Sequence, residues 1–140
     1  MQREPLVDTD VWIDHPRGNP QAIKCVKLLD ERVWISAVSV AELHAGVRKG
    51  TEREALAQLL STLEVVDLNR AVATRGGLLS SDYGRSHGVG LNDALNGATA
   101  LELQLQLLTL NVKHYAALYK QQVKKSLRQS LKYGGKPIVE

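Results

Sequence analysis

Short apolar runs alternate along this chain with longer stretches of helical periodicity, and that alternation most constrains the fold. The runs PLVD, VWISA, VVDL and QLLT are typical of buried strands and occupy residues 5–8, 33–37, 65–68 and 106–109. Helical spacing of apolar residues occupies 20–31, 40–48, 52–64 and 92–104, and a helix-like stretch follows the third strand. Such alternation predicts an α/β fold with a mainly parallel central sheet and helices on both faces.

Several residues mark expected helix boundaries. Asn19 followed by Pro20 is typical of a helix start. Ser39 is expected to cap the helix over 40–48, and Ser39 with Glu42 fits the reciprocal capping box. Gly76 and Gly77 lie inside the helix-like stretch after the third strand, and each glycine costs about 1 kcal/mol in a helix interior. We therefore expect either a break or a close packing contact there.

Length and composition indicate one domain. The 140 residues contain no internal repeat or linker-like segment, and Cys25 is the only cysteine, which excludes an intrachain disulfide and a cysteine-rich zinc site. No apolar run approaches the roughly 20 residues of a membrane span. The opening MQREP does not resemble a signal peptide. These features predict a soluble, cytoplasmic protein with no membrane association.

Charge is unevenly distributed between the two ends. Residues 1–112 contain 11 Lys and Arg against 14 Asp and Glu, whereas residues 113–140 contain 7 against 1. A basic end suggests a polyanionic partner such as nucleic acid, although a solvated helix face explains it equally well. Within the basic end, residues 119–133 are expected to form an amphipathic helix, because apolar residues recur there every four positions.

Four separated segments place polar side chains near the ends of predicted strands or at a helix start. They are Asp8, Thr9 and Asp10 at the first strand; Ser36, Ser39 and Glu42 at the second; Asn92 and Asp93 at the start of the helix over 92–104; and Thr109 and Asn111 at the last strand. In open α/β sheets, ligands bind at the carboxyl ends of the strands. If Asp8, Glu42 and Asp93 converge to about 5 Å, each like-charge pair costs roughly 3 kcal/mol at an effective dielectric of about 20. Mg²⁺ or Mn²⁺ would relieve that repulsion and would suit phosphodiester chemistry.

Each of these residues also has a purely structural explanation. Asp8 and Asp10 fit a turn, and Glu42 fits the capping box. Asn92 could cap the helix and Asp93 could interact with its dipole. Only the combination of segments favours a site. The histidines do not follow a metal-ligand spacing.

Three segments of the chain are distinctive in their order and spacing: LVDTDVWIDHPRGNP, ISAVSVAELHAGV and GLNDALNGATALELQLQLLTLNVKHY. Together they resemble the PIN-domain family, most closely its VapC-type toxins from bacterial toxin–antitoxin pairs, over about residues 5–118. It implies a PIN domain over 1–118, with 119–140 as a basic extension of the same domain. It also implies a Mg²⁺- or Mn²⁺-dependent endoribonuclease.

The resemblance assigns roles residue by residue. Asp8, Glu42 and Asp93 match the family's metal-binding, water-activating acids. Asn111 stands where a fourth acid often falls, and His114 stands where other members carry an acid. Thr9 and Thr109 would be hydroxyl neighbours, and Asp10 would be a reserve ligand if the chain is locally extended there. Asn96 occupies a helix position that is usually apolar in the family, on the same face as Asp93.

The resemblance also implies partners. They are an RNA substrate, a cognate antitoxin, a second copy of the chain, and promoter DNA reached only through the antitoxin complex. The candidate RNA-binding residues are Lys113, Lys120, Lys124, Lys125 and Arg128. One alternative is a PIN-like module that binds RNA or an antitoxin with little or no cutting, which the absence of a fourth acid keeps open. A receiver-like phosphoacceptor domain fits poorly, because Lys113 lies well past the last strand although Asp67 lies in the third.

Overall fold

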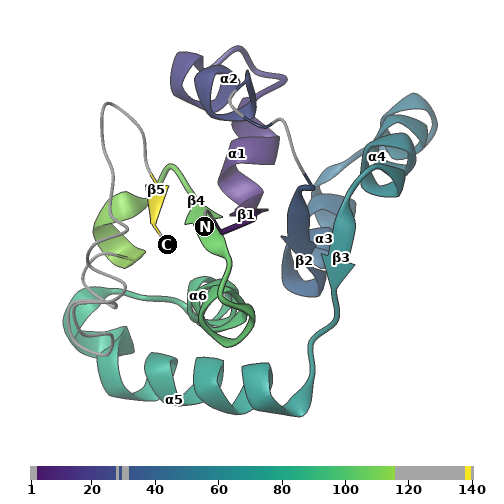
Figure 1. Ribbon diagram of the computed structural model, residues 1–140. Coiled ribbons are helices and arrows are strands. Elements are labelled where there is room, and N and C mark those ends of the chain that lie inside the picture. Colours follow the sequence, from purple (N-terminus) through teal and green to yellow (C-terminus); the bar gives the residue numbers. More distant parts are fainter. Residues whose placement is uncertain (1–2, 28, 30–31, 116–137, 140) are drawn as a thin grey trace.

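The computed structural model describes residues 3–27, 29, 32–115 and 138–139, and it contains a sheet with strand order β3-β2-β1-β4-β5 (Figure 1). The first four strands in sequence run parallel, and β5 pairs antiparallel with β4. The strands are β1 (Pro5–Val7), β2 (Trp34–Ser36), β3 (Glu64–Val66), β4 (Gln106–Leu108) and β5 (Ile138–Val139). The expected mainly parallel sheet is confirmed.

Helices cover both faces of this sheet, as expected (Figure 1). Leu6 and Leu107 are register partners and pack with Ala100 on one side, whereas the next pair, Val7 and Leu108, packs with Val11 on the other. Side chains of a strand alternate between faces, so adjacent apolar residues fill two separate cores. The helices are α1 (Thr9–Asp14), α2 (Pro20–Lys27), α3 (Ala37–Gly46), α4 (Thr51–Ser61), α5 (Arg70–His87) and α6 (Leu91–Leu103).

The glycine pair lies inside one continuous helix, α5, which packs against α6 (Figure 1). A Cβ atom added at Gly76 would lie 2.6 Å from Cδ2 of Leu95 and 3.0 Å from its Cα, whereas Gly77 has nothing within 4 Å. The helix therefore does not break. Gly76 instead provides the close packing contact that was the other expectation.

One local expectation is wrong, and the condition attached to Asp10 is not met. The segment after β1 is not extended, because α1 begins directly at Thr9 with Asp8 as its N-cap. The N-cap of α3 is Ser36 rather than Ser39, and its hydroxyl accepts from the backbone N–H of Ser39 at 3.0 Å. The helix expected over 40–48 begins earlier, because Ser36, the last residue of β2, already serves as its cap. α1 begins where no helix was expected, because Asp8 caps it directly after β1.

The basic extension is largely outside the described residues. The helix expected over 119–133, with Lys120, Lys124, Lys125 and Arg128, belongs to this part of the chain, whereas Lys113 is described and exposed. Among the helices that are described, none combines the length and the apolar character needed to cross a bilayer.

Candidate active site

Asp8 is the most enclosed acid at the carboxyl edge of the sheet, with 5% of its surface exposed. Its Oδ1 accepts from the backbone N–H of Thr9 at 2.9 Å and from Nδ2 of Asn96 at 2.6 Å. Its Oδ2 accepts from the hydroxyl of Thr109 at 2.8 Å. These donors come from α1, α6 and the end of β4, so separate parts of the fold hold this carboxylate in one orientation.

The pKa of Asp8 is raised above its ordinary value, mainly because burial penalises the charged form. The hydrogen bonds from Thr109, Thr9 and Asn96 act in the opposite direction, and the negative charge of Asp93 adds to the rise. The influence of Asp93 shows that these two acids, 85 positions apart, lie close enough to repel one another.

Asp10 lies in the first turn of α1 and contacts the end of β4. Its carboxylate accepts from the backbone N–H of Leu110 at 3.1 Å and from the Thr109 hydroxyl at 3.2 Å. Burial raises the pKa of Asp10 to about 7, and the charge of Asp8 adds to the rise. Thr109 therefore stands between two carboxylates, and its single proton can serve only one of them at a time.

Glu42 lies in α3, past its first turn, and it does not form the expected capping box. Its Oε1 accepts from the Thr9 hydroxyl at 2.7 Å, and its Oε2 accepts from Nδ2 of Asn92 at 3.0 Å. Asn92 is not the cap of α6 either, because the N-cap there is Gly90. The structural explanations offered by sequence for Glu42 and Asn92 are therefore wrong, and both side chains are directed toward the acid cluster instead.

Asp93 lies in the first turn of α6, where the helix dipole favours a negative charge. Its Oδ2 lies 3.6 Å from Nδ1 of His114, and that ring nitrogen lies 2.7 Å from Nδ2 of Asn111. The contact between His114 and Asp93 was not expected from sequence. Asn111 and His114 are three residues apart in sequence, on a helical turn, which is the spacing that brings side chains together.

The structure thus brings the predicted residues to one edge of the sheet. Asp8, Thr9, Asp10 and Glu42 are linked through hydroxyl and amide bridges to Asn96, Thr109 and, through Asn111 and His114, to Asp93. Sequence reasoning left Ser36 and Ser39 out of the site, although both hydroxyls join this network. The signal was present, because Ser36 ends the second strand and Ser39 lies three residues further along.

The donor set is rich in oxygen, as Mg²⁺ and Mn²⁺ sites require. In the described part of the chain, Arg32 and Arg75 pair with Glu64 and Glu102, and no Lys or Arg pairs with Asp8, Asp10 or Glu42. The residues therefore fit a divalent cation in chemistry and in charge. Among the described residues, however, no three acid, His or Cys side chains already stand close enough together to hold an ion.

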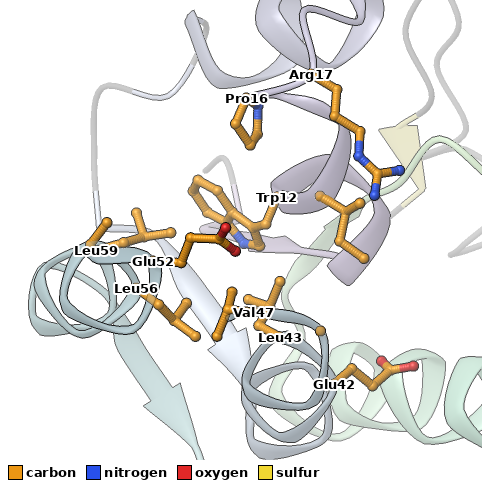
Figure 2. A pocket seen from close by; sticks show the side chains of 12 residues that line it. Trp12, Pro16, Arg17, Glu42, Leu43, Val47, Glu52, Leu56 and Leu59 are labelled. Carbon is orange, nitrogen blue, oxygen red and sulfur yellow. The ribbon is translucent and has the colours of Figure 1, made fainter. Parts of the chain in front are cut away.

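A groove of about 440 Å³ begins beside Glu42, between α1, α3 and α4 (Figure 2). Its walls are mainly apolar, and Figure 2 shows Trp12, Leu43, Val47, Leu56 and Leu59 around it. Arg17 and Glu52 also line it. The groove is therefore a mainly apolar surface with Glu42 at its edge, and Figure 2 shows the Glu42 carboxylate turned away from it.

The amino-acid sequence of this chain matches a known protein family and named relatives within it. The family profile of the PIN domain matches residues 6–119. Ribonuclease VapC10 of Mycobacterium tuberculosis is 42% identical over 115 residues, which cover 79% of this chain and 84% of the relative. Ribonuclease VapC19 of the same organism is 36% identical over 114 residues, which cover 79% and 90% respectively.

Solved structures agree with the sequence comparison. A toxin–antitoxin complex from Klebsiella pneumoniae matches with a TM-score of 0.70 and 26% identity, covering 81% of this chain and 91% of that one. FitAcB from Neisseria gonorrhoeae matches with a TM-score of 0.65 and 25% identity, covering 81% and 92%. The expectation from the sequence motifs is confirmed: the chain belongs to the PIN-domain family and, within it, to the VapC proteins.

Proposed function

We propose that this chain is the toxin of a toxin–antitoxin pair and is a Mg²⁺- or Mn²⁺-dependent endoribonuclease. The main support is the set of acids at the carboxyl edge of the sheet, where Asp8, Glu42 and Asp93 are the proposed metal-binding and catalytic residues. The names of the VapC10 and VapC19 relatives, both called ribonucleases, support the reaction class.

The three proposed metal-binding acids differ in how they are held and in how exposed they are. Asp8 and Glu42 are held by donors from the protein and present oriented carboxylate oxygens. Asp93 is more open, with 34% of its side chain exposed beside the half-exposed His114, and this is the side from which RNA would approach. A bound divalent cation would supply an activated water and positive charge for the phosphate.

The fourth acid of the family is absent here. Asn111 and His114 occupy the positions where an acid is often found, and neither side chain carries a negative charge. Their side chains contact each other at 2.7 Å. Asp10 is a reserve ligand in the proposal, although its carboxylate is turned toward Leu110 and Thr109. The specific consequence is a site that holds one metal ion more readily than two.

The proposal is tested by cleavage of RNA by the purified chain in Mg²⁺, in Mn²⁺ and in EDTA. Asp8→Asn, Glu42→Gln and Asp93→Asn should each abolish cleavage, because each removes a carboxylate without changing side-chain size. Asp82→Asn is the matched control, since Asp82 is an exposed acid on α5, and it should cut like the parent. Cleavage that persists in EDTA, or in all of the site variants, would refute the assignment.

A non-cutting PIN-like module is the second candidate, and the contact between Asn111 and His114 is the observation that favours it. Such a module would bind RNA and metal but would leave RNA intact under every metal condition. Restored cleavage in Asn111→Asp would then identify the missing acid as the cause.

We further propose that the groove beside Glu42 receives an apolar segment of a cognate antitoxin. The Klebsiella structure that matches this chain is described as a toxin–antitoxin complex. An apolar helix or extended segment in the groove would cover Trp12 and Leu59 and would end near the acids. A homodimer, and promoter DNA bound only through the antitoxin complex, remain expectations from the family.

Ile13→Glu should weaken antitoxin binding strongly, because Ile13 lines the groove and is 36% exposed, so a charge there is tolerated in the free chain. Leu78→Glu on α5 is the control, since Leu78 is 59% exposed and does not line the groove. Calorimetric titration of each variant with purified antitoxin measures the effect. Equal affinity for both variants would place the antitoxin elsewhere.

A further inference from the structure

Asn96 is a buried polar residue in α6, about one turn after Asp93, and 2% of its surface is exposed. Its Nδ2 lies 2.6 Å from Oδ1 of Asp8 and 3.2 Å from Oγ of Ser39. Its Oδ1 contacts the hydroxyl of Ser36. All the polar atoms of this amide are therefore engaged in the interior, beside an acid of the proposed site.

The protons of this network have one consistent assignment. The carboxylate Glu42 can only accept, so the Thr9 hydroxyl donates to it at 2.7 Å. The single Thr9 proton is then used, so at the 2.7 Å contact between the two hydroxyls Ser39 donates to Thr9. The Ser39 oxygen in turn accepts from Asn96. One amide hydrogen of Asn96 thus reaches Asp8 directly, and the other reaches Glu42 through Ser39 and Thr9.

The amide orientation follows from the same contacts. With its oxygen toward Ser36, Asn96 accepts the only proton of that hydroxyl and directs both of its own hydrogens to the acid side. In the flipped orientation, the amide oxygen would face Oδ1 of Asp8, and two acceptors without a hydrogen would lie 2.6 Å apart. The network therefore selects one orientation of Asn96.

We infer that Asn96 is a positioning residue whose amide fork fixes the carboxylates of both Asp8 and Glu42 for metal binding. The inference rests on the proposed function, because it concerns the acids of that site. Residues that orient metal ligands commonly change metal affinity about 10- to 100-fold when they are mutated. A buried asparagine that served only the core would change stability and leave the affinity for metal unaltered.

The test measures Mn²⁺ affinity of the full chain by isothermal titration calorimetry. Asn96→Leu removes both branches of the fork and keeps a side chain branched at the same carbon, and should raise the Kd for Mn²⁺ by about 10- to 100-fold. Ser39→Ala interrupts only the branch to Glu42 and should give a smaller rise. Thr99→Val is the matched control, because Thr99 is equally buried in α6 but its hydroxyl donates to the backbone of Leu95.

Circular dichroism and thermal unfolding establish that each variant is folded before titration. If Asn96→Leu does not fold, Asn96→Ser is tested by the same criterion, since it keeps one hydroxyl donor at the position. Cleavage assays at saturating Mn²⁺ add a second readout: kcat should fall, with KM for RNA little changed.

The outcomes separate the inference from the function on which it rests. A Kd for Asn96→Leu equal to that of the parent and of Thr99→Val, with the parent binding Mn²⁺, overturns the role of Asn96 alone. If Ser39→Ala raises the Kd for Mn²⁺ more than Asn96→Leu does, the proposed role of Asn96 is wrong, because Ser39→Ala interrupts only one of the two hydrogen-bond paths that begin at Asn96. A parent chain that binds no Mn²⁺ overturns both the proposed metal site and this inference.

Discussion

The carboxylates of Asp8 and Asp10 face each other across one hydroxyl group, that of Thr109. Electrostatic repulsion between neighbouring acids is therefore the main feature of these residues. No Lys or Arg in the described part of the chain pairs with either carboxylate. Burial raises the pKa of both acids, and their mutual repulsion adds to the rise for Asp10. Asp10, with a pKa of about 7, therefore keeps its proton over a pH range in which an ordinary aspartate is charged.

This arrangement predicts a specific pH dependence. The pKa of Asp10 is about 7 in the folded chain against 3.8 for the ordinary group, so between these values the folded state holds a proton that the unfolded state has lost. The free energy of unfolding should therefore decrease as pH rises through this window. Thermal unfolding in EDTA measures it, and Asp10→Asn should flatten the decline while Asp82→Asn should not. If the free energy of unfolding increases with pH equally in the parent, Asp10→Asn and Asp82→Asn, Asp10 is not the source of the pH dependence.

At the scale of elements, α6 carries both Asp93 and Asn96, and its position depends on α5. Gly76 allows the two helices to approach, because its missing Cβ would otherwise meet the side chain and backbone of Leu95. The next residue, Gly77, has open space around it. Substitutions at the two glycines therefore measure different effects. At Gly76 they test the packing of α5 against α6, and at Gly77 they test only the intrinsic helix propensity of the residue.

Gly76→Ala should destabilise the chain by about 1–3 kcal/mol, because the added methyl group overpacks the contact with α6. Gly77→Ala, its neighbour in the same helix, should instead stabilise by up to about 1 kcal/mol through helix propensity. Urea denaturation compares both with the parent. Equal effects of the two substitutions would show that the approach of α5 to α6 does not require the glycine.

Helix starts were the elements that sequence predicted least well. Ser36, the last residue of β2, caps α3, whereas the sequence pointed to a cap at Ser39. Asp8 caps α1 directly after β1, where no helix was expected. A period of apolar residues identifies the body of a helix but not its first turn, where a single side chain decides the start. The strands were easier, because each is a compact apolar run.

At the scale of the whole molecule, the parallel sheet follows from the alternation of strands and helices. It gathers the residues that follow β1, β2 and β4, and the first turn of α6, at one edge. That much was predictable, and it placed Asp8, Glu42, Asp93 and Thr109 in one region. The partners of each acid were not predictable. Contacts such as Asn92 with Glu42, or His114 with Asp93, depend on the rotation of α6 against α3 and on the turn after β4.

We propose that Asp8, Glu42 and Asp93 together hold one divalent cation. Anomalous X-ray scattering from crystals grown with Mn²⁺ tests it most directly, because it locates the ion without reference to activity. We predict one strong peak among these three carboxylates in the parent chain, and its loss in Asp8→Asn crystals. A peak bound elsewhere, or no peak at these acids in saturating Mn²⁺, would contradict the claim.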